Sequence, residues 1–118
     1  MVANFKAGAN LDGKILAGSQ VAAASATAVY TVPASSAAKV ATCIIHNASG
    51  STLATVAVSV TPAGGSITRV ALVSGLAAGD STDVFELKGA FLEAGAIITL
   101  TPSATAAANY LITGAVSS

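Results

Sequence analysis

The sequence is divided into short segments rich in β-branched residues, and each segment ends at a turn signal. The three prolines, Pro33, Pro62 and Pro102, each follow such a segment directly. Because proline cannot donate a hydrogen bond to a β-ladder, each of them ends a strand. Residues 54–61 show the pattern most clearly, since small and branched apolar residues at even positions alternate with Thr, Ala and Ser. Strict alternation places one set of side chains on each face of a strand, so the chain is expected to form β-sheets.

The same pattern predicts about eight strands along the chain. Turns rich in Gly, Asn, Ser and Ala separate them at regular spacing, which is typical of a sandwich. We therefore expect an all-β fold, a single-domain antiparallel β-sandwich in which a jelly-roll and an immunoglobulin-like arrangement are both open. The predicted strands are residues 14–17, 28–32, 39–47, 53–61, 67–74, 83–88, 96–101 and 108–115.

The length of 118 residues suits one domain with a short extension. Residues 1–13 hold only Val2, Phe5 and Leu11 as apolar anchors and are predicted to form an N-terminal arm, followed by a β-sandwich domain at residues 14–118. These three residues are the candidate subunit contacts. Two roles are open for Phe5, which either latches onto a neighbouring subunit or plugs its own domain.

The chain is unusually poor in charge. Five Lys and Arg balance five Asp and Glu, and charged residues make up only 8% of the sequence. A net charge of zero gives no attraction to phosphate backbones, so nucleic acid is not an expected partner. A surface with so few charges favours association, so we expect much of it to be covered by neighbouring subunits. The alternative is a monomer kept in solution by Ser and Thr hydroxyls.

No segment predicts export or membrane insertion. Ser, Thr or Gly interrupts every apolar run well before the roughly 18 residues that a membrane helix needs. Lys6 and Lys14 precede a short apolar stretch, but it is not the continuous block of a signal peptide. The single cysteine cannot form a disulfide within one chain, which fits folding in a reducing cytoplasm.

No residue pattern predicts catalysis, a cofactor or a metal. Cys43 and His46 are the only thiol and imidazole, and three residues apart on a strand they would point to opposite faces. The five acidic residues are too scattered for a zinc or calcium site. Asn47 begins an Asn-Ala-Ser glycosylation sequon, which is interpreted as a hairpin loop. We therefore expect a protein that is not an enzyme.

Several segments resemble a pattern found in small bacteriophage virion β-sandwich proteins. Residues 29–34, Val-Tyr-Thr-Val-Pro-Ala, precede a strand at 39–47 that ends in Asn. Residues 76–80, Leu-Ala-Ala-Gly-Asp, and 92–97, Leu-Glu-Ala-Gly-Ala-Ile, resemble turns of the same family. The chain departs from the pattern at residues 34–38, where a Gly-containing turn is expected.

This resemblance implies a structural virion protein of a tailed phage. The expected role is that of a capsid decoration, or cement, protein that binds the outside of the shell and bridges major capsid subunits. Such a protein would be a homo-oligomer located in the virion. The alternative is a tail, neck or fibre appendage with a receptor- or glycan-binding role, which predicts an exposed polar or aromatic loop such as residues 47–51.

Overall fold

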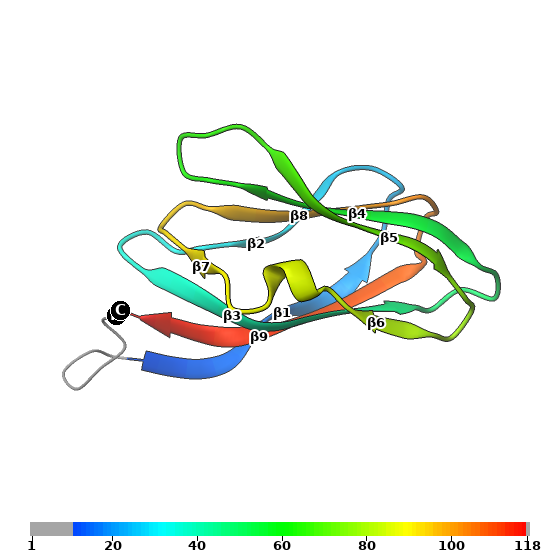
Figure 1. The fold of residues 1–118 in the computed structure, drawn as a ribbon, viewed down its shortest axis with the longest axis horizontal. Coiled ribbons are helices and arrows are strands. Elements are labelled where there is room, and N and C mark those ends of the chain that lie inside the picture. Colours follow the sequence, from blue (N-terminus) through cyan, green and yellow to red (C-terminus); the bar gives the residue numbers. More distant parts are fainter. Residues whose placement is uncertain (1–10, 118) are drawn as a thin grey trace.

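The computed structural model describes residues 11–117, which form two antiparallel β-sheets packed face to face (Figure 1). Sheet A contains β1, β9, β3 and β6 in that order, with the short β7 also paired to β3. Sheet B contains β2, β8, β4 and β5. The elements are β1 (Leu11–Val21), β2 (Thr27–Thr31), β3 (Ala37–Asn47), β4 (Leu53–Thr61), β5 (Thr68–Leu76), β6 (Ser81–Asp83), the 3₁₀ helix η1 (Phe85–Leu87), β7 (Phe91–Leu92), β8 (Ile97–Pro102) and β9 (Ala108–Ser117).

The strand order identifies a jelly roll. Without the two-residue β7, one sheet holds the first, eighth, third and sixth strands and the other holds the second, seventh, fourth and fifth. An immunoglobulin domain instead keeps its first two strands in one sheet, whereas β1 and β2 lie in different sheets here. The predicted all-β sandwich is therefore confirmed, and the arrangement left open by the sequence is the jelly roll.

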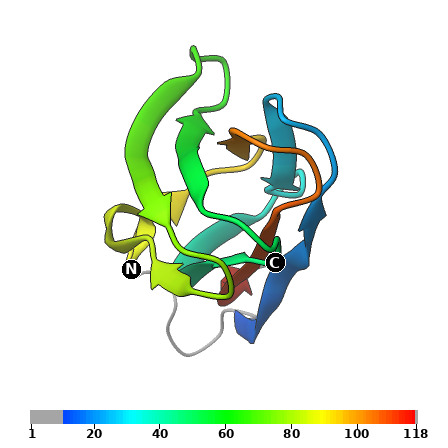
Figure 2. The same cartoon turned by 90° about the vertical axis from the view of Figure 1, so that its right-hand side faces the viewer.

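The core lies between the inner faces of the two sheets. Val56 and Val58 of β4 are fully buried, as the alternation of this segment predicts, and they face Ile45 of β3 and Ile112 of β9 within one apolar cluster. Burying an aliphatic side chain of this size stabilises the fold by about 1.5–3 kcal/mol. Figure 2 shows the two sheets as separate layers, with β1 (blue) at the margin of its layer.

Sheet A is locally distorted on both sides of its central strand β9. The register with β1 shifts at Leu16, and the register with β3 shifts at Ala41. Such bulges bend the strand and increase its twist. The backbones of β3 and β9 lie close together beside the second bulge, where a Cβ added to Gly114 would collide with the carbonyl oxygen of Lys39.

The strand predicted at residues 83–88 is wrong. Strand β6 ends at Asp83, and residues 85–87 form the 3₁₀ helix η1. The inward side chains are Val84 and Leu87, which are both buried and lie three residues apart, while Phe85 is 69% exposed. A spacing of three is the period of a 3₁₀ helix, so the apparent alternation with a period of two was misleading.

The predicted arm boundary also changes. The backbone of residues 11–13 belongs to β1 and pairs with residues 115–117 of β9, so the strand begins inside the segment predicted as an arm. Main-chain hydrogen bonding to β9 explains why the strand extends beyond its β-branched centre. Val2 and Phe5 lie outside the described residues.

Candidate interaction surface

The outer face of sheet A consists of rows of side chains that run across its strands. In the central row, Gly18, Leu111, Ile44 and Asp83 lie opposite one another on β1, β9, β3 and β6. Leu111 is 37% exposed, and Ile15, which borders the same row, is 60% exposed. The row therefore presents aliphatic side chains to the outside of the sandwich.

Rows that contain paired polar side chains flank this apolar row on both sides. On one side the row holds Ile15, Thr113 and Thr42, and the hydroxyls of the two threonines lie 2.6 Å apart. On the other side, Gln20 Nε2 donates to Asn109 Oδ1 at 2.9 Å, and the row continues with the contact of His46 Nδ1 with Ser81 Oγ at 2.8 Å. Since these groups satisfy one another, the apolar row between them is the part that gains most from being covered.

A shallow hollow lies at the β1 end of the central row, and we call it the Gly18 hollow. It forms because Gly18 has no side chain between its larger neighbours. A Cβ added there would lie 3.1 Å from Leu111 Cδ1 and 4.0 Å from Ile15 Cγ2. The hollow is lined by Ile15, Gly18, Ser19, Gln20, Asn109, Tyr110 and Leu111.

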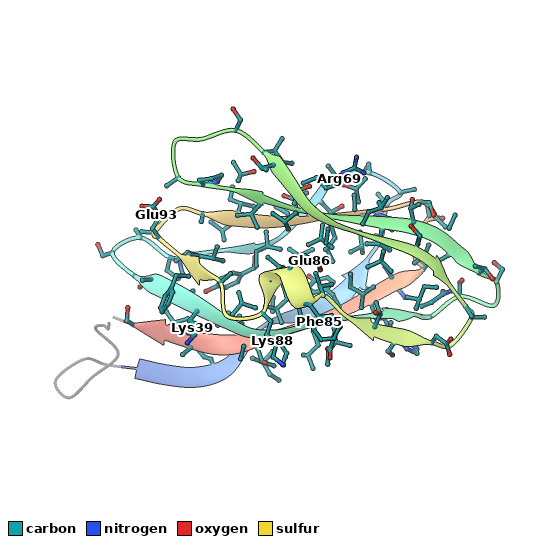
Figure 3. The ribbon with its side chains drawn as sticks, viewed as in Figure 1. Lys39, Arg69, Phe85, Glu86, Lys88 and Glu93 are labelled. Atoms are coloured by element: carbon teal, nitrogen blue, oxygen red, sulfur yellow. The ribbon has the colours of Figure 1, made fainter. Side chains whose placement is uncertain are left out.

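Two exposed aromatic residues lie toward the opposite edge of sheet A. Phe85 follows β6 and is 69% exposed, and Phe91 on β7 is 62% exposed. The ammonium group of Lys39 lies 5.2 Å from the centre of the Phe91 ring, within the range of a cation–π contact. Figure 3 labels Phe85, Lys39 and Lys88 along the sheet A layer, on the side away from Arg69.

The outer face of sheet B has a different composition. One row across it consists of Ala28, Thr99, Ser59 and Arg69, and the next contains Thr101, Ala57 and Leu72. Most of these side chains are small or carry a hydroxyl. Leu72, at 49% exposed, is the large apolar residue of these two rows, and Ile67, directly before β5, is 57% exposed.

The loop after β3, predicted as an exposed binding loop under the appendage hypothesis, is organised around a buried amide. Asn47 is 0% exposed, and its Nδ2 donates to the carbonyl oxygens of Ser51 and Leu76 at 2.8 and 2.9 Å. Its Oδ1 accepts hydrogen bonds from the backbone N–H and the hydroxyl of Ser49, at 2.9 and 2.7 Å. The side chain of Asn47, the sequon asparagine, therefore links the end of β3 to the end of β5 by hydrogen bonds.

The single cysteine is inaccessible. Cys43 points into the core and is 1% exposed, whereas His46 lies on the outer face, so the two side chains point to opposite sides as their spacing predicts. Burial, with a smaller contribution from the charge of Asp83, raises the pKa of the Cys43 thiol to about 11. Within residues 11–117, no group of three His, Cys, Asp or Glu side chains is placed to hold a metal ion.

The sequence did not identify the residues of this surface. The predicted strands at 14–17 and 108–115 include Ile15 and Leu111, but the bulge at Leu16 changes which residues of β1 face outward. Gly18 lies outside every predicted strand. Of the predicted contacts, Leu11 takes part in the pairing of β1 through its backbone, and Val2 and Phe5 lie outside the described residues.

The chain matches no protein-family model, no curated protein and no solved structure. In the part of the chain that the structure describes, no helix is long and apolar enough to cross a membrane.

Proposed function

We propose that this protein is a non-enzymatic structural subunit, and specifically a capsid decoration protein of a tailed bacteriophage. The observation that supports it is the exposure of large apolar side chains on the sheet A side of a domain in which only 8% of residues are charged. Exposed apolar surface of this kind marks sites where other proteins bind. The motifs at residues 29–34, 76–80 and 92–97 that resemble virion β-sandwich proteins supply the virion context.

The proposed mechanism is stabilisation by binding to one state of the shell. A ligand that binds only the assembled capsid stabilises that state by its own binding free energy. Phe85 and Phe91 are suited to contact the major capsid protein, because exposed aromatic side chains bring a large apolar area to an interface. Their partner is a protein surface, since the chain has no net charge with which to attract nucleic acid. The proposed assembly is a homo-oligomer, with a trimer favoured.

The first experiment measures the copy number of this chain in purified virions by quantitative mass spectrometry against the major capsid protein. Hundreds of copies in a fixed ratio to the capsid subunits are expected. About a dozen copies would favour the tail, neck or fibre appendage instead, and absence from the virion would overturn both roles.

A second experiment tests the surface itself, by measuring binding of purified variants to capsids that lack this chain. The double variant Phe85→Ser and Phe91→Ser is expected to bind at least tenfold more weakly. Leu72→Ser on sheet B is the matched control and should bind as the wild type does. Equal binding by the double variant and the wild type would exclude the sheet A side as the capsid contact.

A further inference from the structure

We infer that the edge of β1 binds the N-terminal segment of a second copy of this chain as an added strand, with Phe5 of that copy seated in the Gly18 hollow. This inference concerns contacts between copies and does not depend on the virion role. It is supported by the edge strand, by the hollow beside it and by the sequence of residues 1–10.

Strand β1 is the longest edge strand of the sandwich. It runs over 11 residues and pairs with β9 on one side, and no strand of the described residues lies on its other side. The edges at β5, β2 and β6 have nine, five and three residues. Natural proteins usually protect edges by shortening them or by adding proline and charges, yet β1 contains no proline and Asp12 and Lys14 as its only charged residues. A long edge of this kind is a template for an added strand.

The Gly18 hollow gives such a strand a specific contact. A residue directly opposite Gly18 on an added strand would lie on the outer face of sheet A, because opposite residues share a face. Gly18 has no side chain, so a large apolar side chain opposite it can lie across the glycine and contact Leu111 and Ile15. Aromatic residues are known to stabilise sheet glycines by covering them in this way.

Residues 1–10 have the sequence expected of that strand. From residue 3 onward, Ala3, Phe5, Ala7 and Ala9 alternate with Asn4, Lys6, Gly8 and Asn10, which is the period-two pattern of a strand with one apolar face, and Val2 is the one apolar residue on the other face. Phe5 is the only aromatic residue among them. With Phe5 opposite Gly18 and Leu16 as the bulged residue, Ala7 lies opposite Ile15 and Ala9 lies opposite Gly13. Small residues would then face the exposed Ile15, and the single large one would fill the hollow.

The geometry favours a second copy over the same chain. If residues 1–10 folded back on their own β1 through a two-residue hairpin loop, Phe5 would lie opposite Lys14. Longer loops would move it still further from Gly18. Antiparallel pairing that places Phe5 opposite Gly18 therefore requires the segment of another copy.

Disulfide crosslinking tests the register directly. A Phe5→Cys chain and a Gly18→Cys chain of different mass are mixed and oxidised, while Cys43 remains buried in both. Directly opposite residues of neighbouring strands lie about 4.5–5.5 Å apart between Cα atoms, which a disulfide can bridge. We expect the Phe5→Cys and Gly18→Cys chains to crosslink in higher yield than a control pair, Phe5→Cys with Ser74→Cys on β5. Yields that do not exceed the control would overturn the register.

Sedimentation analysis tests the energetics without capsids. Phe5→Ala is expected to weaken self-association at least tenfold, and Gly18→Leu is expected to do the same by filling the hollow from within. Phe85→Ala is the matched control and should leave association unchanged, with circular dichroism confirming that each variant is folded. A monomeric wild type, or unaltered association of both variants, would overturn the inference. Association through this edge without any capsid binding would support the inference and contradict the proposed function.

Discussion

The two sheets of this jelly roll have similar inner faces but different outer faces. Inside, both sheets contribute fully buried Val, Ile and Leu side chains to one cluster. Outside, sheet A carries an aliphatic row with Leu111 and Ile44 at its centre, whereas sheet B carries mostly Ala, Ser and Thr. Stability of the domain requires only the inner faces. The proposed contact role of sheet A rests on this difference between the outer faces.

The largest expected effect tests the close packing at the centre of sheet A. Gly114→Ala should destabilise the domain by about 3 kcal/mol, because the new methyl group meets the backbone of Lys39, which cannot move aside as a side chain can. Urea denaturation monitored by circular dichroism measures the change. The control is Gly50→Ala, where an added Cβ meets nothing within 4 Å. Similar stability of the two variants would contradict the tight β3–β9 contact.

The next largest effect tests the link between the sheets. Asn47→Ala should cost about 2 kcal/mol, since it leaves buried partners, including the carbonyl of Leu76 at the end of β5, without a hydrogen bond. Asn109→Ala removes a surface amide that bonds to Gln20 and should cost less than about 0.5 kcal/mol. Thermal unfolding measures the loss of stability in both variants. An equal loss would contradict the specific role of the buried Asn47 amide in joining the two sheets.

A smaller effect on self-association is expected from substitutions that compare the outer faces of the two sheets. Leu111→Ser on sheet A and Leu72→Ser on sheet B alter exposed leucines of similar size, at 37% and 49% exposure. Only Leu111→Ser is expected to weaken self-association, by about tenfold, which corresponds to about 1.4 kcal/mol. Analytical ultracentrifugation measures the change. An equal loss in both variants would mean that the two faces do not differ in function.

The smallest effect concerns the turn that leads from sheet B to sheet A. Ser35 has φ of 62°, a left-handed conformation that glycine adopts without steric cost. Ser35→Gly should therefore stabilise the domain by about 0.5 kcal/mol. Ser36→Gly, in the same turn, should be neutral or slightly destabilising. Loss of stability in Ser35→Gly would show that another interaction of Ser35 outweighs its backbone strain.

Local patterns predicted the strands well but not their arrangement. Residues 39–47 and 53–61 were predicted within two residues of β3 and β4, because alternation and a following turn or proline are local signals. The missing glycine in the turn at 34–38 is also explained locally, since Ser35 takes the conformation expected of that glycine. The strand order, in contrast, depends on pairings between distant residues such as Leu11 and Ser117.

The candidate interaction surface could not be predicted from the sequence for a related reason. Before the bulge at Leu16, odd-numbered residues such as Ile15 face outward, and after it even-numbered residues such as Gly18 do so. The bulge is a feature of the pairing between β1 and β9, and no local signal in the sequence marks it. A simple alternation through the segment would have placed Ile15 and Gly18 on opposite faces.

The central position of β9 also affects how the chain can fold as it is made. Strands β1 and β3 both pair with β9, which follows every other strand in the sequence. On a ribosome the β4–β5 hairpin can therefore form early. Strand β1 can pair with β9 only after about 100 further residues have been added, which takes several seconds or more at typical rates of synthesis. During that time the strand edges that later build sheet A are open to other chains. Slower translation, or a chaperone that holds nascent chains, should therefore change the yield of folded protein more than its final stability.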